Sequence, residues 1–182
     1  MRKLVVTAIT GSMVVLGWTG AAGAHTANSS GKLTINSVSR PIIAAWWATN
    51  GELFVKLRSD AVALEVFYRE KHPSSRREFA ACKKLTDDTG PPETAIERAT
   101  NTSSNLSTSL YSATKNIWSS LFDTTAHLDG AGNICAVAST PKRVHVSSKS
   151  RSELTVGLRR LSQVFDSLET AGIPSGVAAT ST

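Results

Sequence analysis

The sequence predicts an all-α fold: a four-helix-bundle-like domain with one disulfide, a flexible N-terminal leader and a flexible C-terminal tail. In several segments apolar residues recur at spacings of three and four, which is the pattern of a helix with one buried face. Capping, glycine and proline patterns separate these segments. Alternation typical of a strand is limited to Val144-His145-Val146, which is too short to predict a strand.

Length and composition agree with this fold class. The chain has 182 residues, of which 41% are hydrophobic and 19% are charged. These values are typical of one globular domain, and they exclude wholesale disorder and collagen-like or disulfide-dense scaffolds. We predict that the helical domain occupies residues 39–172.

Residues 1–24 are predicted to be an export signal. Arg2 and Lys3 form a positive start, a mostly apolar stretch follows, and small residues precede a cut between Ala24 and His25. The alternative is that the segment is kept as an anchor. Cleavage would make the chain secreted or place it in the cell envelope, with residues 25–38 as a flexible leader.

The charge gives little indication of a nucleic-acid partner. Loss of Arg2 and Lys3 with the signal would lower the formal net charge of +6 by two, which leaves an ordinary solubility charge. After the N-terminus no apolar run is long enough to span a membrane. We therefore expect no nucleic acid and no transmembrane span after cleavage. Basic residues around 69–77 and 142–151 are either a solvated rim or a patch for an anionic envelope surface.

The first helix is predicted over 41–70. Ser39 and Pro41 mark its start, and Pro73 follows its end. Asn50-Gly51 interrupts the pattern, and we interpret this pair as a kink in one continuous helix. The regular part of the apolar face consists of Phe54, Leu57, Ala61, Leu64 and Tyr68.

The second helix is predicted over 76–89. Ser75 and Glu78 match a capping box at its start, and Phe79, Cys82 and Leu85 share one side. Gly90 and Pro91-Pro92 predict a firm stop, because proline cannot continue the helical hydrogen bonds.

The third helix is predicted over 93–128 and has the most regular pattern. Leu110 lies at the centre of its apolar stripe, so a charge at this position should unfold the domain. Serine and threonine are poor helix formers and crowd the positions between, so the helix should depend on packing. The stripe consists of Ile96, Ala99, Ser103, Leu106, Leu110, Ala113, Ile117 and Leu121.

The C-terminal part is predicted to hold a long connection and a fourth helix. Residues 130–149 contain glycine, proline and small polar residues, which favour an irregular segment. Ser150 and Glu153 match a second capping box, before a helix predicted over 151–171. Residues 173–182 are predicted to be a disordered tail.

Cys82 and Cys135 are the two cysteines of the chain. An exported chain meets an oxidising compartment, which favours a disulfide between them. A free thiol pair and a metal site are the alternatives, although the four histidines lack the spacing of a zinc site. With antiparallel second and third helices, residues 130–134 must fold back for Cys135 to reach Cys82.

An ordered set of motifs spans about residues 41–137: Trp46-Trp47, Gly51, Asp60, Leu64, Ala81-Cys82-x-x-Leu85, Pro91-Pro92 and Cys135. In this order they resemble small exported helical proteins of mycobacteria and related actinobacteria. The resemblance implies a signal peptide and a two-cysteine helical core, and it transfers no catalytic or binding residue. The chain departs from the pattern in its serine- and threonine-rich third helix and in its added helix at 151–171.

Trp46 and Trp47 are the candidate residues for binding a ligand or partner. Adjacent side chains on a helix point about 100° apart. One indole can therefore enter the core while the other stays accessible to a ligand. The alternative is that both indoles pack between helices.

No catalytic residue, metal ligand or cofactor is predicted. Asp123 and His127 could form part of a hydrolase relay, but the chain has no Gly-x-Ser-x-Gly motif. Tyr68, Tyr111 and the histidines could in principle bind haem, but the Cys-x-x-Cys-His attachment motif is missing. The sequence favours a non-enzymatic exported module that binds a protein partner or a small apolar ligand. The alternatives are a small secreted enzyme with a site in 130–149 and a structural envelope component.

Overall fold

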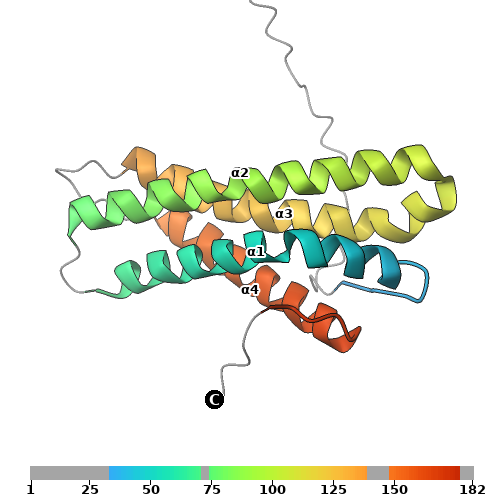
Figure 1. Ribbon diagram of the computed structural model, residues 1–182. Helices are drawn as coiled ribbons and strands as arrows, with labels where there is room; N and C mark the ends of the chain where they lie inside the picture. Colours follow the sequence, from blue (N-terminus) through green and yellow to red (C-terminus); the bar gives the residue numbers. More distant parts are fainter. Residues whose placement is uncertain (1–32, 71–73, 139–147, 177–182) are drawn as a thin grey trace, which may run out of the picture.

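The computed structural model describes residues 33–70, 74–138 and 148–176. These residues form four helices, α1 (Arg40–Arg69), α2 (Ser75–Leu106), α3 (Thr108–Ala138) and α4 (Ser148–Thr170). Consecutive helices run antiparallel, α2 and α3 lie side by side along most of their length, and α4 packs against α3 and α1 (Figure 1). The predicted all-α bundle is confirmed, and the described residues contain no strand.

Helix α1 is continuous through Asn50-Gly51, as predicted. Gly51 is buried, and a Cβ atom there would lie 2.6 Å from Nε1 of Trp47, four residues earlier. The missing side chain therefore makes room for an indole on the same helix. The glycine is a packing feature in the middle of α1, and it does not break the helix.

The predicted break at 90–92 is wrong. Helix α2 continues through Gly90, Pro91 and Pro92 as far as Leu106, and the chain reverses at Ser107. Proline inside a helix costs about 3 kcal/mol because an amide donor is lost and its ring clashes with the preceding turn. Packing offsets this cost, because both halves of α2 lie against the same helix α3.

Ser107 is the residue that separates α2 from α3. Its backbone is extended, with φ −167° and ψ 153°. Its side-chain oxygen accepts a hydrogen bond from the backbone N–H of Leu110 at 3.1 Å, which is the arrangement of a helix N-cap. Serine is common in this stretch, so the sequence alone did not single out this position as the turn.

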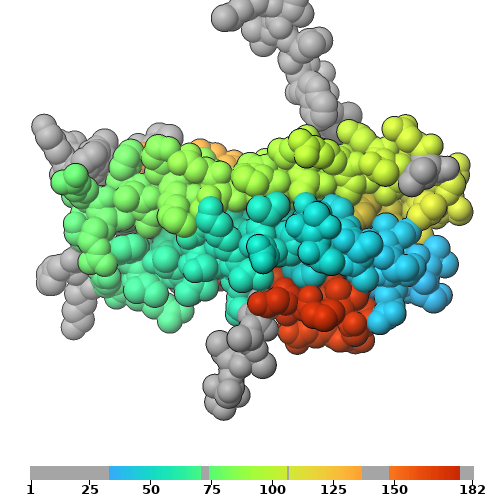
Figure 2. Space-filling model, in the orientation of Figure 1, coloured from blue at the N-terminus to red at the C-terminus, as the bar shows by residue number. Residues whose placement is uncertain are grey.

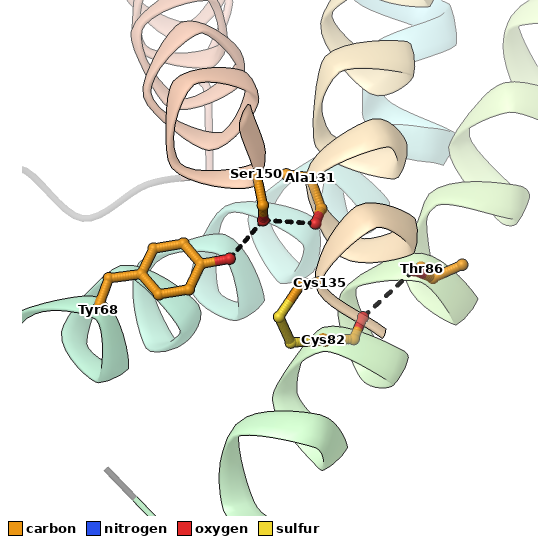
Figure 3. The surroundings of a disulfide bond; sticks show 6 residues. All are labelled: Tyr68, Cys82, Thr86, Ala131, Cys135 and Ser150. Atoms are coloured by element: carbon orange, nitrogen blue, oxygen red, sulfur yellow. Dashed lines mark hydrogen bonds between the residues drawn. A yellow bond between two sulfur atoms is a disulfide. The ribbon is translucent and has the colours of Figure 1, made fainter. Parts of the chain in front are cut away.

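Cys82 of α2 and Cys135 of α3 form a disulfide, which confirms the predicted pairing (Figure 3). The two residues lie at nearly equal distances along the chain from Ser107, so an antiparallel hairpin brings them level, with their Cα atoms 5.6 Å apart. The expected fold-back at 130–134 is wrong, because α3 stays helical to Ala138. The disulfide thus closes the α2–α3 hairpin near the end away from its turn.

The irregular connection predicted over 130–149 is wrong at both of its ends. Residues 130–138 belong to α3, and α4 begins at Ser148. The part between, residues 139–147, lies outside the described residues.

The predicted flexible leader and tail are wrong where they border the bundle. Leu33 is buried, and its N–H donates to Oγ of Ser167 in α4 at 3.2 Å. Ile173 is buried as well, and the carbonyl of Ser175 accepts a hydrogen bond from Nε1 of Trp47 at 3.3 Å. Residues 25–32 and 177–182 of the two predicted segments, and the predicted signal at 1–24, lie outside the described residues.

Neither predicted capping box forms. Glu78 is fully buried and makes no capping hydrogen bond, while Ser150 and Glu153 lie inside α4, which begins earlier than predicted. Oγ of Ser150 donates to the carbonyl of Ala131 at 2.8 Å, and Oε2 of Glu153 lies 2.6 Å from Nδ1 of His127. The polar residues of the second motif therefore join α4 to α3.

Among the described residues, no helix combines the length and hydropathy that a bilayer crossing needs.

Candidate functional site

A groove of about 800 Å³ lies between the first half of α1, the second half of α2 and the start of α3. Its sides are the first half of α1 and the second half of α2, which run next to each other on the face shown in Figure 2. Ligand sites in proteins have volumes of about 300–1,000 Å³, so the groove has the size of a small-molecule site. Its apolar lining residues are Ile42, Trp46, Leu53, Pro91, Ala95, Ala99, Leu110 and Trp118.

Trp46 and Trp118 form an aromatic surface inside the groove. Their rings meet edge to face with centroids 5.0 Å apart, and Trp46 contacts Phe54 in the same manner at 5.8 Å. Trp118 is only 2% exposed, and its Nε1–H donates to Oγ of Ser103 at 3.3 Å. The hydrogen bond and the ring contacts fix the position of Trp118, while Trp46 stays partly exposed.

The structure separates the two adjacent tryptophans. Trp47 is 4% exposed, lies against Phe54 and Phe165 at centroid distances of 5.2 and 5.8 Å, and donates its N–H to Ser175. It also borders a second hollow of about 670 Å³ beside residues 174–176. Trp47 is thus a core residue that holds the C-terminal segment, and Trp46 is the one that lines the groove.

The rim of the groove is polar on the α2 side. Thr94, Arg98 and Thr102 line it and are exposed. Thr102 Oγ1 donates to the carbonyl of Arg98 at 2.8 Å, and on α1 Asn50 Nδ2 donates to the carbonyl of Trp46 at 2.9 Å. The polar groups of these two side chains are therefore already paired within their own helices. Among the described residues that line the groove, Arg98 is the only charged one.

Leu110 lies at this groove and not at the centre of a helix. It belongs to the first turn of α3 and is partly exposed. The predicted position was wrong because the third helix starts at Thr108 and not near residue 93. Further along α3, Ile117 and Leu121 of the predicted stripe are buried.

Asp123 and His127 lie close together, but their contacts are those of an ion-pair network between α3 and α4. Nε2 of His127 is 4.0 Å from Oδ1 of Asp123, and its Nδ1 is 2.6 Å from Oε2 of Glu153. Asp123 also forms an ion pair with Arg160. Since both imidazole nitrogens face carboxylates, this geometry differs from the relay in which histidine takes a proton from serine.

A second polar cluster lies next to the disulfide (Figure 3). The hydroxyl of Tyr68 is hydrogen-bonded to Oγ of Ser150, which donates to the carbonyl of Ala131. The guanidinium of Arg151 lies 5.3 Å from the centre of the Tyr68 ring. Burial raises the pKa of Tyr68 above its ordinary value. The cluster joins α1, α3 and α4.

Glu78 of α2 is a fully buried carboxyl group whose charge acts on Tyr68. Neither of its oxygens has a hydrogen-bond partner in the described structure. Burial raises the pKa of Glu78 above its ordinary value, and the positive charge of Arg151 opposes the shift. A neutral Glu78 is therefore easier to accommodate than a charged one.

Helices α1 and α2 also share an ionic contact. Lys84 bridges Asp60 of α1 and Asp88 of its own helix, and Lys56 pairs with Asp88 at 2.8 Å. Burial raises the pKa of Asp60, whereas hydrogen bonding to Asp60 lowers the pKa of Asp88. In the basic stretch at 69–77, Arg69 forms an ion pair with Glu65. The guanidinium of Arg77 lies over the ring of Phe67.

Comparison of the chain with protein-family models, curated proteins and solved structures found no match.

The sequence indicated only Trp46 among the groove residues. Pro91 was predicted to stop a helix and Leu110 to lie in the core, and Arg98 was not singled out. The helix predicted over 93–128 runs straight through Ser107, so it does not bring Leu110 back against the second half of α2. The signal in the sequence was Ser107, whose side chain caps the helix that has Leu110 in its first turn. A helix start at this position would have placed the second half of α2 beside α1.

Proposed function

We propose that the protein is an exported, non-enzymatic binding module that holds a small apolar molecule in the groove between α1, α2 and α3. The observation that carries the proposal is the partly exposed indole of Trp46, which packs edge to face against the buried Trp118 and borders a groove of about 800 Å³. Burial of apolar ligand surface against such a lining is favourable by about 25 cal/mol per Å².

The construction of the groove supports a preformed site. At the groove, Trp118 is held by its hydrogen bond to Ser103 and by its ring contact with Trp46. The disulfide joins α2 to α3 at the other end of the same hairpin. A ligand that enters a preformed site loses little of its binding free energy to ordering of the protein. The disulfide itself supports export, because such bonds persist in oxidising compartments.

The test is a fluorescence titration with N-phenyl-1-naphthylamine, an uncharged apolar probe that brightens when it leaves water. We expect saturable binding to the wild-type chain. Ala95 lines the groove, so Ala95→Phe should fill part of it. We expect this variant to weaken binding about tenfold, which equals about 1.4 kcal/mol.

Ala80→Phe is the matched control, because Ala80 is exposed on the same helix and lies outside the groove lining. It should bind the probe like the wild type. Circular dichroism and melting temperature of both variants verify that the fold is kept. Absence of saturable binding by the wild type, or equal affinities of the two variants, would refute the proposal.

A further inference from the structure

We propose that the molecule held in the groove is an amphipathic carboxylic acid, whose apolar part lies on Trp46 and Trp118 and whose carboxylate pairs with Arg98. This inference rests on the proposed function and names the class of ligand. Its basis is the juxtaposition of an apolar aromatic surface with a single cation at the rim of the same groove.

The charges around the groove favour an anionic head group. Arg98 is the only charged residue that lines it, and its guanidinium has no ion pair within the described structure. In contrast, Lys56, Lys84 and Arg160 are each paired with a carboxylate. A guanidinium presents two parallel N–H donors to a carboxylate, and this geometry suits one singly charged group.

The nearby acidic residues do not cancel this preference. Glu93 and Glu97 of α2 interact electrostatically with each other, and Glu93 also interacts with Asp129 of α3. These three carboxylates therefore gather where α2 faces Asp129, and none of them lines the groove. A carboxylate in the groove meets the cation of Arg98, while the acidic cluster lies on another side of α2.

The position of Arg98 matches the shape of an amphipathic ligand. Thr94, Arg98 and Thr102 follow one another at intervals of one helical turn along the exposed rim, while Trp118 is almost completely buried below. An apolar tail can lie on the indole of Trp46, above Trp118, while the head group stays at the edge with water. Near an apolar surface, the interaction between opposite charges is also less screened than in bulk water.

The experiment compares three ligands with the same tail: dodecanoate, dodecan-1-ol and dodecylamine. Each is titrated below its critical micelle concentration against wild type, Arg98→Gln and Arg159→Gln by displacement of N-phenyl-1-naphthylamine and by calorimetry. Arg159 is the matched control, because it is exposed on α4, outside the groove, and its loss changes the net charge equally.

We expect the wild type to bind dodecanoate about fivefold more tightly than dodecan-1-ol, with dodecylamine weakest. Arg98→Gln should remove the preference, so that dodecanoate and dodecan-1-ol bind with similar affinities. Arg159→Gln should keep the preference.

Equal affinities of the three ligands for the wild type, or a preference that survives Arg98→Gln, would overturn the inference. Both results can occur while the apolar probe still binds, in which case the proposed function stands and only the ligand class is wrong. Failure of the probe and of all three ligands to bind would refute both.

Discussion

Gly132 of α3 lies directly against the backbone of Thr86 in α2. A Cβ atom at Gly132 would be 2.9 Å from the backbone nitrogen of Thr86 and 3.0 Å from the carbonyl oxygen of Cys82. Backbone atoms inside a helix cannot move away without disturbing its hydrogen bonds. The close approach of α2 and α3 beside the disulfide therefore depends on this glycine.

Gly132→Ala should destabilise the protein by about 1–3 kcal/mol, because overpacking would force the two helices apart. Urea denaturation measures the loss. Gly90→Ala is the control, since a Cβ at Gly90 meets nothing within 4 Å. In this variant the higher helix propensity of alanine should leave stability unchanged or raise it by up to about 1 kcal/mol. Equal effects of the two substitutions would contradict the packing described here.

Reduction of the disulfide should lower the free energy of unfolding by about 4 kcal/mol in the chain-entropy model, since the two cysteines are 53 positions apart in the sequence. Denaturation with and without a reductant gives this difference. For the double variant Cys82→Ser with Cys135→Ser, the reductant should not measurably change the free energy of unfolding. Peptide mapping under non-reducing conditions should link the two cysteine peptides, and recovery of two free thiols would contradict the pairing.

The stability should depend on pH through Glu78. Because burial raises its pKa in the folded state above the ordinary value of 4.5, the folded chain holds this proton more tightly than the unfolded chain. The resulting stability is present below pH 4.5 and is lost as pH rises through the pKa of the folded state. Glu78→Gln keeps the shape without the charge, so it should be more stable than the wild type at neutral pH.

The measurement is urea denaturation of wild type and Glu78→Gln across the acidic to neutral range. The gap between the two proteins should narrow towards low pH. Asp60 and Glu93 also have raised pKa values, so part of the pH dependence should remain in the variant. Parallel curves at all pH values would show that Glu78 does not carry the effect.

The hydrogen bond between Trp118 and Ser103 should contribute to stability as well as to the groove. Ser103→Ala leaves a buried indole N–H without its acceptor, which should cost about 1–3 kcal/mol. Ser104→Ala is the matched control, because Ser104 is exposed and its hydroxyl donates only to the carbonyl of Asn101 on the same helix. If thermal denaturation finds the two variants equally stable, the hydrogen bond has no such role.

Leu110→Asp should affect binding more than folding, since Leu110 is partly exposed at the groove. The probe titration should show a marked loss of affinity, with circular dichroism close to that of the wild type. Leu121→Asp places a charge at a residue that is 1% exposed and should unfold the domain. Unfolding by both substitutions would mean that Leu110 belongs to the core.

Much of the bundle was predictable because buried faces repeat along each helix. Phe54, Leu57 and Leu64 of α1, and Leu161 of α4, are buried as the spacing of three and four requires. The pairing of Cys82 with Cys135 followed from the count of cysteines and the expected export. The buried faces depend on short stretches of sequence, which a periodic pattern can represent.

The boundary between α2 and α3, and with it the groove, was not predictable in the same way. Local rules assign a stop to Pro91-Pro92, but α3 packs along both sides of that point and keeps the helix intact. The capping pattern at Ser150 and Glu153 was equally misleading, because these residues bond to α3. In each case contacts distant in sequence outweigh a local preference.

Apolar ligands should enter the groove beside Trp46 and Trp118 and leave Trp47 undisturbed. The most direct measurement is the indole N–H spectrum of isotope-labelled protein during titration with N-phenyl-1-naphthylamine, with signals assigned by single Trp→Phe substitutions. We predict that the signals of Trp46 and Trp118 shift progressively to saturation, while that of Trp47, which is bonded to Ser175, stays in place. Shifts confined to Trp47, or no shift at Trp46 and Trp118, would contradict the account.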